Sequence, residues 1–482
     1  WLHSEMVYSR DRDWAATNDF TEQGGRRIGS PNGSPPTLLR YDTFSWEPDP
    51  SCGADPLVSW EAPVYGGTAC LFNYKQYDGL ITGNERLGVT LTGRYDIKSE
   101  LSLFGDLLYS DRDSENSQAA APIANSHLIE TWTGFPYVPI DHPANPFGTD
   151  GELRSRAQDV GSRDYSVEST AWRFVAGLKG LLGNWDWLAT VLLAQNDVTN
   201  TGRNEISRTR YQQALLGMGG PNGDMYYNPF GEQPQNSAEV KNWISATHLG
   251  KHESKASGLE FEVNGFFGAL AGGPVGMAAG AEFRKNELDQ WWDEQTMSDD
   301  LAGFGVLVPV SADRSVASAY IEFSLPLHET FEAQLAARYD HYDDFGSTTN
   351  PKVALRWQPI PSLMFRGSYS TSFSPPSFNE LFDPVAMELQ WYIDTVRCEY
   401  TGLEEDCSWW EYPSQYSGNP NLDPEEGESW FVGMVWEPES VPGLNFQLDF
   451  WKFEHENRIV WFDPQNVLDA GGDQGIQREP TG

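Results

Sequence analysis

Positive charge is scarce in this chain of 482 residues, which has 32 Lys and Arg against 70 Asp and Glu. The net charge of −38 at pH 7 excludes a nucleic-acid-binding protein, because such a protein holds phosphates on a basic face. A mean hydropathy of −0.51 argues against a protein that crosses a membrane repeatedly with helices.

One uncharged run, Val263–Ala281, has the length of a membrane helix. It contains Pro274 and the pair Gly272–Gly273, which interrupt a helix and favour a tight turn. We therefore predict two strands joined at Ala271–Pro274 rather than one helix.

Only four cysteines are present, and they form two local pairs, Cys52 with Cys70 and Cys398 with Cys407. Pairs of cysteines in polar segments rich in Gly and Pro suggest loop disulfides and an oxidising compartment. Four unrelated thiols are the alternative. A zinc site is disfavoured because no C-x-x-C spacing occurs.

The chain lacks the common catalytic signatures, with no G-x-S-x-G elbow, P-loop or H-E-x-x-H. His248 and His252 have the spacing of a helical metal pair, but Gly250 and polar neighbours favour a surface loop there. We expect no enzymatic activity, no metal and no cofactor.

Aromatic residues and alternating segments are what the chain has in abundance. Aromatics make up 13% of the residues, and polar and apolar side chains alternate with a period of two, which is typical of half-apolar strands. In 363–373, for example, Leu363, Phe365, Tyr369 and Phe373 share one side, while Arg366, Ser368, Ser370 and Ser372 share the other. We predict twelve strands, at 88–97, 101–110, 169–182, 185–196, 258–267, 275–285, 315–325, 331–342, 351–358, 363–373, 429–437 and 444–451.

The connections between these segments alternate in length. Short ones are Ile97–Glu100, Gly183–Asn184, Ala271–Pro274, Pro326–Glu329, Pro359–Ser362 and Glu437–Gly443. Long ones cover 111–168, 199–257, 286–314 and 375–428, with 343–350 as a short exception. Such parity predicts an all-β, antiparallel up-and-down transmembrane β-barrel with short periplasmic turns and long extracellular loops.

Aromatic residues gather in two settings. Those near strand ends, such as Trp185, Trp187, Trp357 and the pair Phe450–Trp451, fit interfacial girdles, with ordinary core packing as the alternative. A second group lies in the loop beside the Cys398/Cys407 pair, at Trp391, Tyr392, Trp409, Trp410, Tyr412 and Tyr416. These rings could stack on a sugar or a flat organic ligand, or pack against one another.

Several ordered motifs resemble those of TonB-dependent outer-membrane receptors. They are Arg338–Lys352 with the strand that follows, Ser370–Phe382, Gly418–Glu425, and Ala317–Leu325 with its Leu-Pro-Leu end. The resemblance implies a 22-stranded barrel in the outer membrane of a Gram-negative bacterium, with an N-terminal plug. It also implies uptake of iron–siderophore complexes, haem, cobalamin or oligosaccharides, driven by the TonB complex.

On this view residues 1–482 are an interior piece of the barrel region, incomplete at both ends, without the plug domain or a TonB box. The expected partners are outer-membrane lipid, the TonB complex through the missing plug, and a small-molecule or oligosaccharide ligand. Candidate ligand contacts are the loop aromatics and two arginines expected to face the lumen, Arg338 and Arg366.

A soluble secreted β-protein that binds or hydrolyses carbohydrate is the main alternative. It would have turns of mixed length at both strand ends and would bury its apolar faces against each other. A plain diffusion porin would leave the long aromatic loops unexplained.

Overall fold

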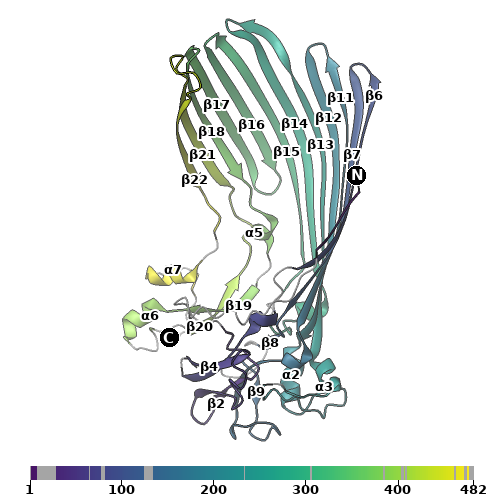
Figure 1. Cartoon of the computed structure of the whole chain (residues 1–482), viewed down its shortest axis with the longest axis vertical. Helices are drawn as coiled ribbons and strands as arrows, with labels where there is room; N and C mark the ends of the chain where they lie inside the picture. The colour runs from purple at the N-terminus through teal and green to yellow at the C-terminus, as the bar shows by residue number, and fades with distance from the viewer. Residues whose placement is uncertain are drawn as a thin grey trace.

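The computed structural model describes residues 2–7, 29–64, 66–77, 82–123, 134–232, 234–303, 307–383, 386–402, 407, 410–460, 463–471 and 475–476. One long antiparallel sheet of 13 strands, here called the wall, dominates it (Figure 1). In spatial order the wall contains β1 (Leu2–Val7), β6 (Gly83–Lys98), β7 (Leu101–Gln118), β11 (Arg163–Leu182), β12 (Trp185–Ile206), β13 (Ser245–Leu270), β14 (Gly273–Trp292), β15 (Val310–His328), β16 (Phe331–Tyr342), β17 (Gly346–Ile360), β18 (Leu363–Ser374), β21 (Glu425–Trp436) and β22 (Phe446–Glu456).

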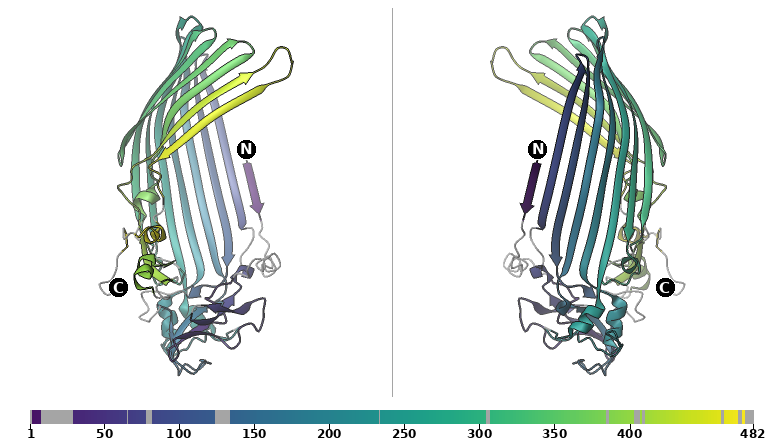
Figure 2. Two further views of the ribbon diagram at one scale, coloured as in Figure 1. Left: turned by 90° about the vertical axis from the view of Figure 1, so that its left-hand side faces the viewer. Right: turned by 90° about the vertical axis from the view of Figure 1, so that its right-hand side faces the viewer.

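Wall strands that follow one another in the chain also lie side by side, so the topology is up-and-down. All twelve predicted strands are present, and Val263–Ala281 forms the end of β13, a turn and the start of β14. The antiparallel all-β prediction is therefore confirmed. In the described residues β1 and β22 each pair with one neighbour, so the wall is a curved, open section of a barrel (Figure 2).

The two faces of the wall differ in chemistry because side chains alternate along each strand while paired residues share a face. Leu91, Leu107, Phe174 and Leu193 oppose one another across four strands and form part of an exposed apolar face. On the other, polar face, Ser370 opposes Lys352 and Ser429. This is the alternation expected of a transmembrane barrel.

The apolar face ends before the strands do. Towards the long loops, Asp197 opposes Glu253, and Glu253 opposes Asp289, on the same side of the sheet as the apolar residues. Neighbouring carboxylates repel one another and are tolerated in water rather than lipid. The strands therefore extend well past the end of the apolar face. The predicted strands are shorter than the observed ones because the outer ends carry no apolar alternation.

Aromatic residues edge the apolar face at its short-turn end, where Trp357 stacks on Phe365 and Trp185 on Phe267. The prediction for Trp451 is wrong. Trp451 opposes Phe431 on the polar face, because adjacent residues of a strand point to opposite sides and Phe450 occupies the apolar one.

A second unit, here called the cap, covers the long-loop end of the wall (Figure 1). It is built from the described residues of four separate connections, namely 29–64 with 66–77, 119–123 with 134–160, 206–232 with 234–244, and 298–303. These stretches share one apolar core that includes Leu38, Leu153, Tyr211 and Ala302. Its elements are β2 (Thr37–Arg40), β3 (Ser45–Pro48), β4 (Ser59–Val64), β5 (Gly67–Phe72), β8 (Pro122–Ile123), β9 (Tyr137–Val138), β10 (Gly151–Arg156), the 3₁₀ helices η2 (Tyr74–Tyr77) and η3 (Gln158–Val160), and α2 (Arg208–Leu215) and α3 (Ala238–Ile244).

Local sequence explains the two cap helices, since Ser207 and Ser237 accept backbone hydrogen bonds as their N-caps. A disulfide joins Cys52 to the buried Cys70. The remaining short elements are α4 (Glu294–Met297), α5 (Phe378–Phe382), β19 (Ala386–Tyr392), α6 (Thr395–Thr401), β20 (Trp410–Tyr416) and α7 (Pro464–Asp469). Within the described ranges, no helix combines the length and the apolar composition needed to span a membrane.

Replacing Leu153 by Ala should destabilise the cap by about 2–5 kcal/mol, because Leu153 is fully buried in its core. Protease susceptibility and hydrogen exchange of cap amides would measure this. Leu57→Ala is the matched control, since Leu57 is 58% exposed on the same unit and its loss should change stability by less than about 0.5 kcal/mol. Equal effects of the two substitutions would contradict a packed cap core.

Nitroxide labels at Ser368 and Tyr369 should report opposite environments in a reconstituted membrane. Tyr369 packs on Trp430 on the apolar face, so its label should be accessible to oxygen dissolved in lipid. The label at Ser368 should instead be accessible to a water-soluble nickel complex. Similar accessibility at both positions would refute the transmembrane wall.

Candidate functional site

The candidate site consists of the polar face of the wall and the loops above it. Arg338, predicted as a ligand contact, lies on the polar face of β16. It forms ion pairs with Asp340 at 2.8 Å and with Glu282 of β14 at 3.5 Å. The hydroxyl of Ser318 donates a 2.6 Å hydrogen bond to Asp340. Three neighbouring strands thus hold Arg338 in a fixed orientation, with its charge already matched by carboxylates.

Arg366, the other predicted arginine, lies on the polar face of β18. Its guanidinium group bonds both carboxylate oxygens of Asp449, at 2.9 and 3.1 Å, and lies 5.0 Å from the centre of the Phe431 ring. The rings of Trp451 and Phe453 contact each other beside this pair, with centroids 5.3 Å apart. This corner of the polar face therefore presents exposed aromatic surface next to a paired charge, a combination that suits ligands with flat or ring-shaped apolar faces.

A buried arginine holds the rim of the wall together. Arg314 of β15 forms a 2.6 Å ion pair with Asp344 and donates a 2.8 Å hydrogen bond to the carbonyl of Pro376. Its guanidinium group also faces three rings, those of Tyr342, Phe345 and Phe378. Arg314 thus joins two of the family-like motifs, the segments 338–352 and 370–382. Helix α5 begins beside it with a Ser377–Glu380 capping box.

The aromatic loop forms a hairpin of β19 and β20, with α6 between them and a disulfide from Cys398 to Cys407. The hydroxyl groups of Tyr392 and Tyr416 lie 2.9 Å apart, so a hydrogen bond joins these two side chains across the hairpin. Trp391, Trp410 and Tyr412 are placed on the strands by their backbone, but their side chains lie outside the described part of the structure, as does all of Trp409. Their role as ligand contacts stays a prediction.

The cap carries a shallow crevice of about 480 Å³ on its surface. It is lined by Asp49, Pro50, Ser51, Ala144, Pro146, Asn228, Phe230 and Gly231. The carboxylate of Asp49 already accepts hydrogen bonds from Ser51 and from the backbone of Gly231. The crevice therefore offers mainly apolar and backbone surface to a ligand.

A buried acid lies where the cap meets the wall, beyond the end of the apolar face. Glu205, at the end of β12, is fully buried and accepts a 2.7 Å hydrogen bond from the hydroxyl of Tyr165. Its second carboxylate oxygen has no hydrogen-bond partner among the described residues. Burial raises the pKa of Glu205 to about 7, although Tyr165 and the positive charge of Arg163 act against that rise.

The histidine of the neighbouring strand is also buried. Nδ1 of His248 lies 3.9 Å from a carboxylate oxygen of Glu205, and burial lowers the pKa of His248. The predicted surface loop at His248–His252 is therefore wrong: both residues lie on β13, whose backbone pairing with β12 continues beyond the membrane band. The described residues contain no group of three or more His, Cys, Asp or Glu that could hold a metal ion.

A family model described as "TonB dependent receptor-like, beta-barrel" matches residues 8–479. The chain belongs to the TonB-dependent receptor family. The members of this family are transport receptors rather than enzymes, and they are proteins of the outer membrane of Gram-negative bacteria.

Solved structures similar to this TonB-dependent receptor chain include two siderophore receptors and one peptide importer. The siderophore receptor PirA from Acinetobacter baumannii is 14% identical with a TM-score of 0.43, covering 79% of this chain and 44% of its own. The same four values hold for a mutant of the ferric enterobactin receptor PfeA from Pseudomonas aeruginosa. The RagAB peptide importer in its closed-closed state is 14% identical with a TM-score of 0.44, covering 78% of this chain and 41% of its own. The chain thus spans less than half the length of these structures, and no curated protein matches it.

The lumen-side position of the two arginines in this receptor chain was predictable from the alternation of their strands, but their carboxylate partners were not predicted. Asp449 and Glu282 could have been found by continuing the alternation of β22 and β14, since both fall on polar positions. The inward position of Trp451 follows from the same alternation. Glu205 gave no such signal, because its burial depends on the cap, whose stretches come together only in the folded chain.

The stability of the contact between cap and wall should fall as pH rises from about 4.5 to 7. Glu205 keeps a proton in the folded state over this range, whereas in the open state, with the ordinary value of 4.5, it would lose it. The difference between the two pKa values of Glu205 changes the free energy of opening the contact by at most about 3 kcal/mol. Glu205→Gln should remove this pH dependence, which hydrogen exchange of cap amides, compared between variants at each pH, would show.

Glu239→Gln is the control for this experiment, because Glu239 is an exposed acid on the same unit. His248 acts in the opposite direction below pH 6.5, where its protonation favours the open state. The difference between wild type and Glu205→Gln isolates Glu205 from that effect. If the difference in opening free energy between wild type and Glu205→Gln stayed constant across pH 4.5–7, Glu205 would not be the group that causes the pH dependence.

Proposed function

We propose that this chain forms barrel wall and ligand-gathering loops of an outer-membrane receptor that binds a scarce nutrient for TonB-driven uptake. The family match over residues 8–479 carries this proposal. The two-faced wall supports it, because one face suits lipid and the other a water-filled lumen. A soluble sandwich is disfavoured, since the apolar face of the described wall is exposed rather than buried against a second sheet.

The ligand class that fits best is a small molecule with flat or ring-shaped faces, either an iron–siderophore complex or an oligosaccharide. The proposed contacts are Trp391, Tyr392, Trp409, Trp410, Tyr412, Tyr416, Arg338 and Arg366. Aromatic rings provide contact area for such faces at little cost in entropy. The net charge of −38 acts against polyanionic ligands that are not neutralised by a metal ion.

Energy for uptake would come from the TonB complex. Coupling to it is proposed to run through a plug domain, which the family resemblance places N-terminal to a barrel of this kind. The polar face requires no covalent chemistry for its part, because binding and release of the ligand are its whole task.

Deleting the gene for the full-length receptor should abolish uptake of one ligand class, tested with radiolabelled iron–siderophores and labelled oligosaccharides. In the restored strain, Tyr392→Ala with Tyr416→Ala should weaken ligand binding about tenfold, since each lost ring contact is worth about 0.5–1.5 kcal/mol. Tyr339→Ala is the matched control, because Tyr339 lies on the apolar face with 48% of its side chain exposed. Unchanged uptake of both classes in the deletion strain would refute the proposed function.

A further inference from the structure

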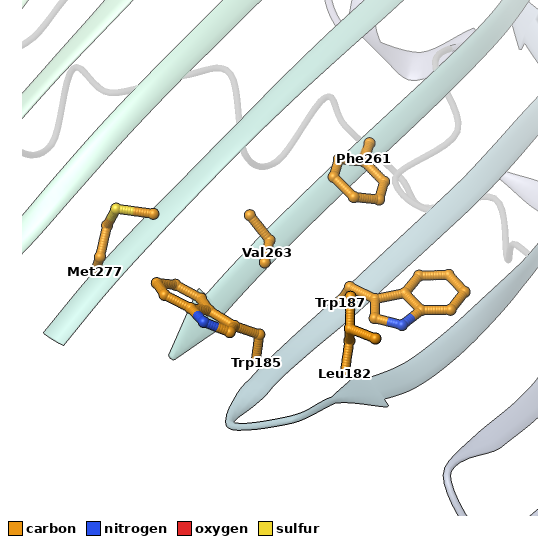
Figure 3. A pocket seen from close by; sticks show the side chains of 6 residues that line it. All are labelled: Leu182, Trp185, Trp187, Phe261, Val263 and Met277. Carbon is orange, nitrogen blue, oxygen red and sulfur yellow. The ribbon is translucent and has the colours of Figure 1, made fainter. Parts of the chain in front are cut away.

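The apolar face is hollowed near the turn between β11 and β12. A cavity of about 340 Å³, here called the indole hollow, opens there (Figure 3). It spans four strands and is lined by Leu182, Trp185, Trp187, Phe261, Val263 and Met277. All six lining side chains are apolar, and none carries a charge.

Two glycines in register with the tryptophans make room for the indole rings. Gly180 opposes Trp187, and Gly265 opposes Trp185. A Cβ atom on Gly180 would lie 2.5 Å from the Trp187 ring, and one on Gly265 would lie 2.8 Å from the Trp185 ring. Each indole ring therefore packs directly on glycine backbone. A side chain larger than hydrogen at either glycine would clash with the ring.

The two indole rings turn away from each other, with Val263 between them (Figure 3). On its far side Trp185 stacks on Phe267, with ring centroids 6.3 Å apart and planes at 17°. Phe267 thus holds the Trp185 ring in place at the edge of the hollow.

We propose that the indole hollow seats an acyl chain of a phospholipid in the inner leaflet of the outer membrane. The hollow is continuous with the exposed apolar face, which in this family faces lipid. It lies at the short-turn end, which is the periplasmic side of such a barrel. An uncharged lining of this kind matches a hydrocarbon chain, which has no polar group to satisfy.

The position of the tryptophans also suits the other end of a lipid. Trp185 is the first residue of β12, so its indole lies at the level where the wall leaves the membrane. An indole N–H at that level can donate a hydrogen bond to an ester or phosphate oxygen of the headgroup. Contacts with the six lining side chains would hold the acyl chain of the lipid, and an indole N–H donor would hold its headgroup.

The proposal rests on the transmembrane placement of the wall, but not on ligand uptake. The test uses the full-length receptor in phosphatidylcholine vesicles that contain increasing fractions of a lipid with brominated acyl chains, which quench nearby tryptophans. The signal of Trp185 and Trp187 is obtained by subtracting the fluorescence of a Trp185→Phe/Trp187→Phe variant, because the chain contains 19 tryptophans. A Trp357→Phe/Trp436→Phe variant gives the matched signal of two tryptophans on the same face, outside the hollow.

The proposal expects the Trp185/Trp187 signal in wholly brominated lipid to fall about threefold lower than that of the control pair, because a seated chain keeps its bromine atoms in contact with the two indole rings. Val263→Phe, which fills the hollow at a lipid-facing position, should bring the two curves together. If the quenching curves of the two tryptophan pairs coincided in the wild type, the proposed lipid seat would be refuted. The transmembrane placement of the wall would still stand. Absence of quenching at both pairs would overturn the seat together with the membrane placement in the proposed function.

Discussion

Unbroken backbone pairing between neighbouring strands is the constraint on which this structure depends. In lipid there is no water to satisfy an open N–H or C=O group, so each strand must bond its neighbours along its length. The ladder between β11 and β12 runs without a register shift from Leu182 opposite Trp185 to Asp164 opposite Arg203. Because the register is fixed, each side chain is committed to one of two faces, and the separation of apolar from polar surface follows.

The same ladder carries the functional groups beyond the membrane. Strands β12 and β13 continue past the band of apolar residues and deliver Glu205 and His248 to the base of the cap. Their pairing becomes irregular only between Gly202 and Glu205, where the backbone of Asn204 takes a positive φ of 61°. The cap thus sits on a rigid extension of the wall, and a protonatable contact lies where the regular ladder ends.

Much of the fold could be predicted from the sequence because alternation has a direct physical cause. Segments such as Leu363–Ser374 must show one apolar and one polar side, and the short turns leave little freedom in strand order. Strand length was harder to predict, since polar residues such as Asp197 and Glu253 keep pairing in water with no alternation to mark them. The burial of Tyr227 in the cap core depends on partners from other parts of the chain, which no local pattern marks.

The candidate site was predictable to a smaller degree for a related reason. Position on a face follows from local sequence, so Arg338 and Arg366 could be assigned to the lumen side. Which carboxylate meets each guanidinium depends on strand register, and a shift of one residue would send Asp449 to the opposite face. The hydrogen bond between Tyr392 and Tyr416 likewise joins residues 24 positions apart in the chain, which no local sequence pattern brings together.

Because the cap is assembled from several connections, it cannot be separated from the wall as an independent domain. Leu38, Leu153, Tyr211 and Ala302 reach the shared core from four different connections between wall strands. Every continuous stretch that contains the whole core also contains wall strands, so the cap cannot be excised alone as one fragment or transplanted as one insertion. Exchanging it between scaffolds would require four grafts at once, on strands that hold the same spacing.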